Sequence, residues 1–291
     1  IVVVVGGILL VPTMIDWQSY KPRLVALLSD TTGRAVAIDG PVEFALLPQP
    51  ALQLGGIKVG NAPGTTSPFL LEARRVAARL SWRALLQGRV EVTRIALDEP
   101  RVAIEPAVDG QPNWWLPLLE SRGQDGPPLV PLSVDRVDIR QGRLVHARGL
   151  VGQAIDARAV DLAIRLEDGA RRVHVTGSAV TNGVPVTLSL DLQAAAPDKP
   201  PLAFTFGAPG GRLSFSGSAG ERTEARPMQG HVSVAARYLP EFVRSVSLLL
   251  GVSPVRLNEA FGQVDTSGEI LLVDGHLSLD RFNFRTAVDL F

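Results

Sequence analysis

Most of the chain alternates apolar and polar residues with a period of two, which is the pattern of half-buried β-strands. The alternation is clearest between residues 160 and 206, where Asp168-Gly169 and Asn182-Gly183 interrupt it. Such dipeptides are typical of tight hairpin turns. We therefore predict a mainly β protein built from successive antiparallel hairpins, each with one apolar and one polar face. Shorter stretches predict further strands at residues 90–97, 101–105, 213–215 and 271–279.

Three segments instead place apolar residues at helical spacing. Residues 16–29 predict a short amphipathic helix, and Gly33 supplies a stop signal after it. Residues 67–86 are a second helical candidate, although residues 76–80 fit a strand equally well. Residues 238–250 predict a third helix with a single apolar stripe.

The first eleven residues carry no charged or polar side chain. As a helix they would cover about 16 Å, roughly half of a hydrocarbon core, so we predict a truncated transmembrane anchor over residues 1–15. Trp17, Tyr20 and Lys21 follow, and such residues suit a membrane interface. The alternatives are a signal-peptide core and a buried strand. Because the chain starts at Ile1, within the apolar run, we expect a longer parent protein.

A polar segment rich in glycine and proline, residues 121–131, is the best candidate for a linker. It separates an N-terminal domain, residues 16–120, from residues 132–291, in which we expect the antiparallel hairpins to continue.

Composition excludes several functional classes. Lysine plus arginine (29) equals aspartate plus glutamate (29), and no basic cluster contains aromatic residues, so nucleic acid is not a predicted partner. The absence of cysteine excludes disulfides, thiolate metal sites and cysteine nucleophiles. The 46% hydrophobic and 20% charged fractions are typical of a folded protein.

The polar residues form no recognisable catalytic or metal-binding pattern. The four histidines lie far apart in sequence, and neither a nucleophile elbow nor a phosphate-binding loop occurs. Acidic residues such as Asp98, Asp138 and Asp161 look like parts of solvated strand faces. We therefore predict no catalytic residue, no metal, no cofactor and no enzymatic activity.

The apolar face of the alternating strands is the remaining candidate for a binding site. A buried sandwich core and an open groove share the same alternation, so the pattern alone does not point to a groove. Taken alone, it favours the more ordinary closed sandwich. As an open groove it would hold lipid tails, and its lining would comprise Val160, Leu162, Ile164, Leu166, Val173, Val175, Val186, Leu188, Leu190, Phe204 and Phe206.

Several N-terminal segments follow one another in a distinctive order and spacing. After the apolar run and residues 16–20 they are Thr32–Gly40, Phe44–Leu52, Leu85–Val92, Ile95–Pro100 and Asp109–Trp114. In this order and spacing they resemble the AsmA family of proteins anchored in the inner membrane of Gram-negative bacteria. The resemblance covers about the first 115 residues and becomes weak after residue 131.

The resemblance implies an elongated, curved antiparallel sheet whose apolar groove shields acyl chains, as in chorein-type bridge proteins. It also implies a single-pass inner-membrane protein, with its bulk in the periplasm, that moves phospholipid toward the outer membrane and maintains that membrane. The implied partners are phospholipid acyl chains, the inner membrane and a periplasmic or outer-membrane protein. The alternative function is that of a closed β-sandwich scaffold assisting outer-membrane protein assembly.

Overall fold

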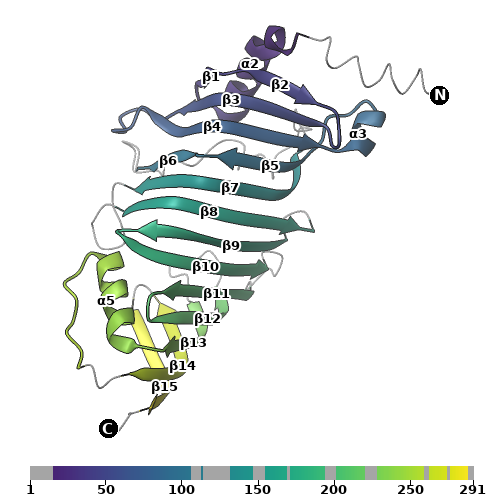
Figure 1. Cartoon of the computed structure of the whole chain (residues 1–291). Coiled ribbons are helices and arrows are strands. Elements are labelled where there is room, and N and C mark those ends of the chain that lie inside the picture. The colour runs from purple at the N-terminus through teal and green to yellow at the C-terminus, as the bar shows by residue number, and fades with distance from the viewer. Residues whose placement is uncertain are drawn as a thin grey trace. The chain divides into compact units, whose positions relative to one another are not determined.

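The computed structural model describes residues 16–105, 113, 132–146, 155–168, 171–193, 201–219, 228–258, 262–273 and 276–287. The chain divides into two compact units, residues 1–148 (unit 1) and 149–291 (unit 2). Strands dominate both units, which confirms the predicted mainly β class (Figure 1).

The predicted anchor at residues 1–15 and the predicted linker at residues 121–131 lie outside the described residues. Of the helices that the structure does describe, none has the length and apolar character needed to cross a membrane.

Unit 1 begins with a short 3₁₀ turn, η1 (Trp17–Tyr20), that leads directly into α2 (Lys21–Thr32). The helix predicted over residues 16–29 is thereby confirmed. It ends at Gly33, whose φ of 64° lies in the left-handed region, where glycine is less strained than residues with a side chain.

The strands of unit 1 form a mixed sheet. Its order is β1-β3-β4-β5-β7, with β2 beside β3 and β6 between β4 and β7. The elements are β1 (Val36–Ile38), β2 (Val42–Ala45), β3 (Ala51–Gly60), β4 (Phe69–Leu80), α3 (Trp82–Leu86), β5 (Val92–Asp98), β6 (Arg101–Ile104) and β7 (Leu132–His146).

Two sequence-based expectations fail in unit 1. The helical candidate at residues 67–86 is wrong over most of its length, because β4 pairs with β3 on one edge and with β5 and β6 on the other. The expectation of antiparallel pairing throughout is also wrong, because β7 runs parallel to both β5 and β6. The connection from β6 to β7 spans residues 105–131, which is long enough for the crossover that parallel strands require.

The hydrophobic core of unit 1 lies between α2 and the first strands. Side chains of η1 and α2, namely Trp17, Leu24, Val25 and Leu28, pack against it. Its buried members are Val36, Ile38, Val42, Leu54, Ile57, Val59 and Ala73.

Unit 2 is a run of antiparallel neighbours, as the sequence predicts. Asn182 and Gly183, with φ angles of 50° and 81°, form the turn between β9 and β10. The strands are β8 (Ile155–Glu167), β9 (Arg172–Thr181), β10 (Val184–Gln193), β11 (Pro201–Ala208), β12 (Gly211–Ala219), β13 (Met228–Ala236), β14 (Gln263–Val273) and β15 (His276–Ala287).

One helix, α5 (Leu239–Leu250), connects β13 to β14 and confirms the helix predicted over residues 238–250. It contacts β10, β11 and β12 (Figure 1). Its Phe242 is buried together with Ala236 and Val264. The side-chain amide of Asn182 donates to the carbonyls of Leu248 and Leu249 at 3.4 Å, so the β9–β10 turn holds the C-terminal end of α5.

Candidate functional site

The register of unit 2 gathers its large apolar side chains on one face of the sheet. Ile164 lies opposite Val175, and that row continues through Leu190 and Phe204 to Phe215. Parallel rows lie two residues away on either side, as the alternation of strand side chains requires. We call this set the apolar face: Leu162, Ile164, Leu166, Val173, Val175, Val186, Leu188, Leu190, Leu192, Leu202, Phe204, Phe206, Leu213, Phe215, Val232 and Val234.

The opposite face of the same strands is polar and lined by small side chains. Its central row runs from Thr176 through Ser189, Thr205 and Ser214 to Ser233. The hydroxyls of Thr205 and Ser214 are 3.3 Å apart, within hydrogen-bond distance. The two faces therefore differ sharply in chemistry.

The apolar face is only half-buried. Leu188 keeps 39% of its surface exposed, and most other members of the apolar face, such as Ile164 and Phe204, are intermediate in exposure. The exception is Phe215, at 3%, whose ring lies over Gly217 and Gly230 and stacks on Phe204 at 5.4 Å. A closed sandwich would bury such residues almost completely. Among the described residues of unit 2, the main strand–strand contacts join only sheet neighbours.

Helix α5 covers one end of this face. Its Leu239 and Val246, together with Phe242, pack near Leu213 and Val234. The rows of the apolar face furthest from α5, one of which includes Leu166, lie outside that cluster. The covered end gives unit 2 its small core, and the remainder presents apolar side chains without a described partner.

Ten of the eleven residues predicted to line a groove lie on this single face. The eleventh, Val160, lies in the irregular segment between Arg158 and Asp161, where the register with β9 shifts. That these residues bind lipid stays a prediction. Sequence reasoning did not include Phe215 and Val232, although the strands that carry them show the same alternation.

A hollow of about 700 Å³ lies on the polar side of the sheet, which sequence reasoning did not anticipate. Part of its lining is one cross-strand row, made by Asp161, Ser178, Thr187, Gly207 and Arg212. The hollow arises where side chains are short, and Gly207 has none at all.

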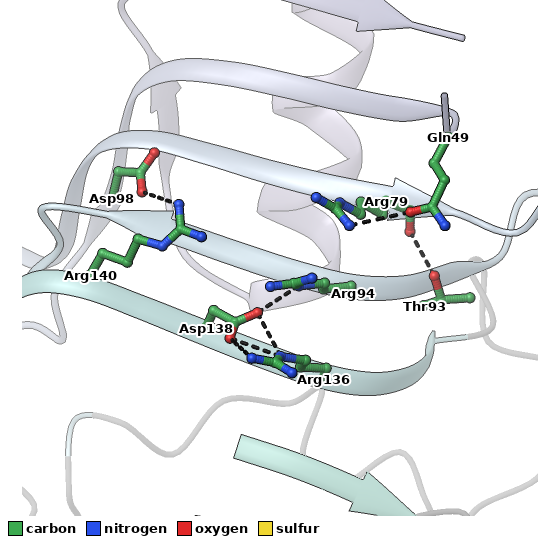
Figure 2. Close-up of polar contacts among 8 residues, drawn as sticks. All are labelled: Gln49, Arg79, Thr93, Arg94, Asp98, Arg136, Asp138 and Arg140. Carbon is green, nitrogen blue, oxygen red and sulfur yellow. Dashed lines mark hydrogen bonds and ion pairs between the residues drawn. The ribbon is translucent and has the colours of Figure 1, made fainter. Parts of the chain in front are cut away.

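In unit 1, the most tightly paired charge of the described residues is Asp138 on β7 (Figure 2). Arg94 donates to its carboxylate at 2.6 Å and Arg136 at 2.8 Å. Burial alone would raise the pKa of Asp138, but the hydrogen bonds from the two arginines outweigh it and hold the pKa below its usual value. Asp138 is only 6% exposed, so the expectation of a solvated acid is wrong there.

A second buried polar group, the Glu105 carboxylate, lies directly after β6. Glu105 accepts hydrogen bonds from the backbone amides of Thr66 and Ser67, at 2.7 and 3.1 Å. Burial would raise the pKa of Glu105, yet these hydrogen bonds lower it below its ordinary value. Asn113, which is 1% exposed, accepts from the Glu105 amide and donates to the Ala103 carbonyl. Of the Asp109–Trp114 segment, Asn113 alone lies within the described residues.

No described group of three or more histidine, aspartate or glutamate side chains is placed to bind a metal ion. His174 instead contacts Asp191 at 2.5 Å, and His231 contacts Glu269 at 3.3 Å, each across neighbouring strands. The expectations of no metal, no cofactor and no catalysis stay predictions.

The fold and its apolar face define a mainly β protein with a half-exposed hydrophobic sheet surface. The model of the AsmA family matches residues 1–133, which is consistent with an AsmA-family N-terminal part, as the resemblance predicts. No curated protein and no solved structure matches the chain. The family match ends at the start of β7, and the apolar face of unit 2 lies beyond it.

Proposed function

We propose that this protein is a membrane-anchored periplasmic protein that binds phospholipid acyl chains on the apolar face of unit 2. In that role it takes part in phospholipid transport to the outer membrane and in the integrity of that membrane. The observation that carries the proposal is the half-exposed apolar face, which extends across neighbouring strands from β8 to β13.

The energetic argument rests on apolar area. Contiguous exposed apolar surface is uncommon on soluble proteins and marks interaction sites. Burial of an acyl chain contributes about 0.8 kcal/mol per CH₂ group, so contact with a short stretch of chain suffices for useful affinity. Such binding recognises the acyl chain and depends little on the headgroup, which suits bulk lipid transport.

The family match supports the cellular setting, because AsmA-family membership suggests a membrane-associated periplasmic protein with a role in lipid transport or outer-membrane assembly. The scaffold alternative requires a closed sandwich with a dry core. The exposure of Leu188 and the antiparallel succession from β8 to β15 do not favour that alternative.

The test compares two triple variants of the chain expressed in the periplasm. Leu162→Asp, Leu188→Asp and Phe204→Asp place three charges on the apolar face. The matched control, Ala163→Asp, Ser189→Asp and Thr205→Asp, places the same charges at neighbouring positions on the polar face. Phospholipid in an organic extract of each purified protein is quantified by mass spectrometry. We expect near-stoichiometric lipid in the native chain and in the control, and its loss in the apolar-face variant.

Three outcomes contradict the proposal. A folded native chain without lipid argues against lipid binding by this chain. Lipid retained in the folded apolar-face variant argues against this face. Lipid lost only in the control relocates binding to the hollow beside Thr187 and Gly207.

A further inference from the structure

One face of the unit 1 sheet carries a regular arrangement of charged residues. On β4, β5 and β7, Arg79 lies opposite Arg94, which in turn lies opposite Arg136. Two residues further along the strands, Ala77, Ala96 and Asp138 form the next row. Arg75, Asp98 and Arg140 form the third. We call these nine residues the arginine face, and Figure 2 shows most of its charged side chains on one side of the strands.

The middle row contains the only small side chains of this arrangement, and they produce a hollow. Its volume is about 190 Å³. Ala77 and Ala96 form the floor, because they lie opposite each other and have only a methyl group. The hollow is lined by Gln53, Arg75, Ala77, Arg79, Arg94, Ala96, Asp98 and Arg140.

The charges around the hollow are unbalanced. Asp138 is the shared partner of Arg94 and Arg136, so one negative charge faces two positive ones, and Asp98 lies 3.9 Å from Arg140. Among the residues that the structure describes, the guanidinium of Arg79 contacts only the neutral side chain of Gln49, at 3.2 Å. Within the described part of the chain, Arg75 forms no ion pair. Asp98 is the one carboxylate in the lining, against four arginines.

Like charges directly opposite each other in a sheet are unfavourable. Arg79, Arg94 and Arg136 nevertheless share one row, with a single buried carboxylate for two of them. An anion in the hollow would relieve this repulsion. The pairing with Asp138 also fixes the position of Arg94, so less side-chain entropy is lost when Arg94 binds a ligand.

We propose that the hollow of the arginine face binds a phosphate group. Guanidinium groups match the geometry of phosphate oxygens and form charge-assisted hydrogen bonds with them, often in pairs. Arg79 and Arg94 lie in the row on one side of the alanines and Arg75 in the row on the other side, all three line the hollow, and they would supply the donors. The same chemistry accepts a free phosphate or the phosphodiester of a lipid headgroup. The site lies in unit 1 and does not depend on acyl-chain binding by unit 2.

The experiment titrates the purified chain by calorimetry at constant ionic strength. The two probes are inorganic phosphate and glycerophosphoglycerol, the soluble phosphodiester of a common lipid headgroup. Arg79→Gln removes an exposed donor, and we expect affinity to fall at least about tenfold, as for the loss of a charge-assisted hydrogen bond. Ala96→Leu fills the floor without changing charge and should abolish binding. Arg101→Gln is the matched control, because it removes the same charge from the exposed first residue of β6, outside the hollow.

Binding of one probe alone supports the site and identifies its source as the free anion or the headgroup. The proposal is overturned if neither probe binds the native chain. It is also overturned if Arg101→Gln weakens binding as much as Arg79→Gln, because the effect would then be one of general surface charge. Retention of full affinity in a folded Ala96→Leu variant would also refute it.

Discussion

Both units present an apolar sheet face and one main helix, yet they cover that face to different extents. In unit 1, α2 and η1 pack against the first strands, and residues such as Ile38 and Val42 keep 4% or less of their surface exposed. In unit 2, α5 buries Phe242 and Val264 at one end, whereas Leu188 stays 39% exposed.

The difference does not come from the length of the helices. Both α2 and α5 contain twelve residues and therefore extend about 18 Å. Strands lie about 4.8 Å apart, so a helix of this length spans about four of them at most. The contacts of α5 with β10, β11 and β12 agree with that limit. Unit 2 runs from β8 to β15, so α5 alone is too short to cover all of its apolar face.

The comparison predicts that truncating a buried side chain of α5 destabilises unit 2 more than truncating an exposed one. Phe242→Ala removes the main contact of α5 with the sheet and should cost unit 2 about 4 kcal/mol of unfolding free energy. Hydrogen exchange should show faster exchange throughout residues 239–250. Leu248→Ala, on the same helix but 44% exposed, is the control and should change the unfolding free energy by less than about 0.5 kcal/mol. Equal effects of the two variants would mean that α5 does not pack through Phe242.

A leucine pair compares the two units directly. Leu54→Ala, at a position 7% exposed in unit 1, should cost about 3 kcal/mol. Leu188→Ala, on the apolar face of unit 2, should cost about 1 kcal/mol or less in the absence of lipid, because less of its surface is buried. All four tryptophans lie in unit 1, so their fluorescence reports its unfolding, and circular dichroism follows both units. Comparable losses would show that a partner covers Leu188 in solution.

Buried polar contacts also distinguish unit 1. Asn113→Ala removes the acceptor of the Glu105 amide and the donors to Ala103 and Asn61, and should cost about 2 kcal/mol, since it leaves buried groups unsatisfied. Tryptophan fluorescence during urea unfolding measures the loss in unit 1, and circular dichroism follows the control variant in unit 2. Gln229→Ala, at an exposed position on β13, should have no measurable effect. A neutral Asn113→Ala variant would mean that solvent reaches these groups.

Local signals in the sequence account for much of unit 2. Asn182-Gly183 predicts its turn because both residues tolerate positive φ, and the alternation from Val184 to Leu192 predicts β10 and its faces. The apolar stripe of residues 238–250 likewise predicts the helix α5. These elements depend on neighbours in sequence, so the sequence alone suffices.

The remaining features depend on contacts between distant segments. Arg94 and Asp138 are 44 residues apart, and only the parallel pairing of β5 with β7 brings them together. The strand β4 contradicts its partly helical pattern because three strands pair with it. Alternation indicates which residues of the apolar face share a side, but not how much of that side α5 covers. That extent follows from the number of strands and the path of the chain.

The smallest expected effect concerns pH and separates a buried carboxylate of unit 1 from an exposed one of unit 2. Glu105 has a lowered pKa in the folded state, so its stabilisation is complete above the unfolded value of about 4.3 and is lost as pH falls through the folded pKa. Glu105→Gln should therefore cost about 1 kcal/mol at pH 7, and the difference from the native chain should shrink below about pH 4. Unfolding across this range is followed by tryptophan fluorescence for unit 1 and by circular dichroism for both units. Glu269→Gln, at a side chain 54% exposed, should cost less than about 0.5 kcal/mol at pH 7. A Glu105→Gln deficit that persists unchanged to pH 3 would indicate lost packing and not a lost charge.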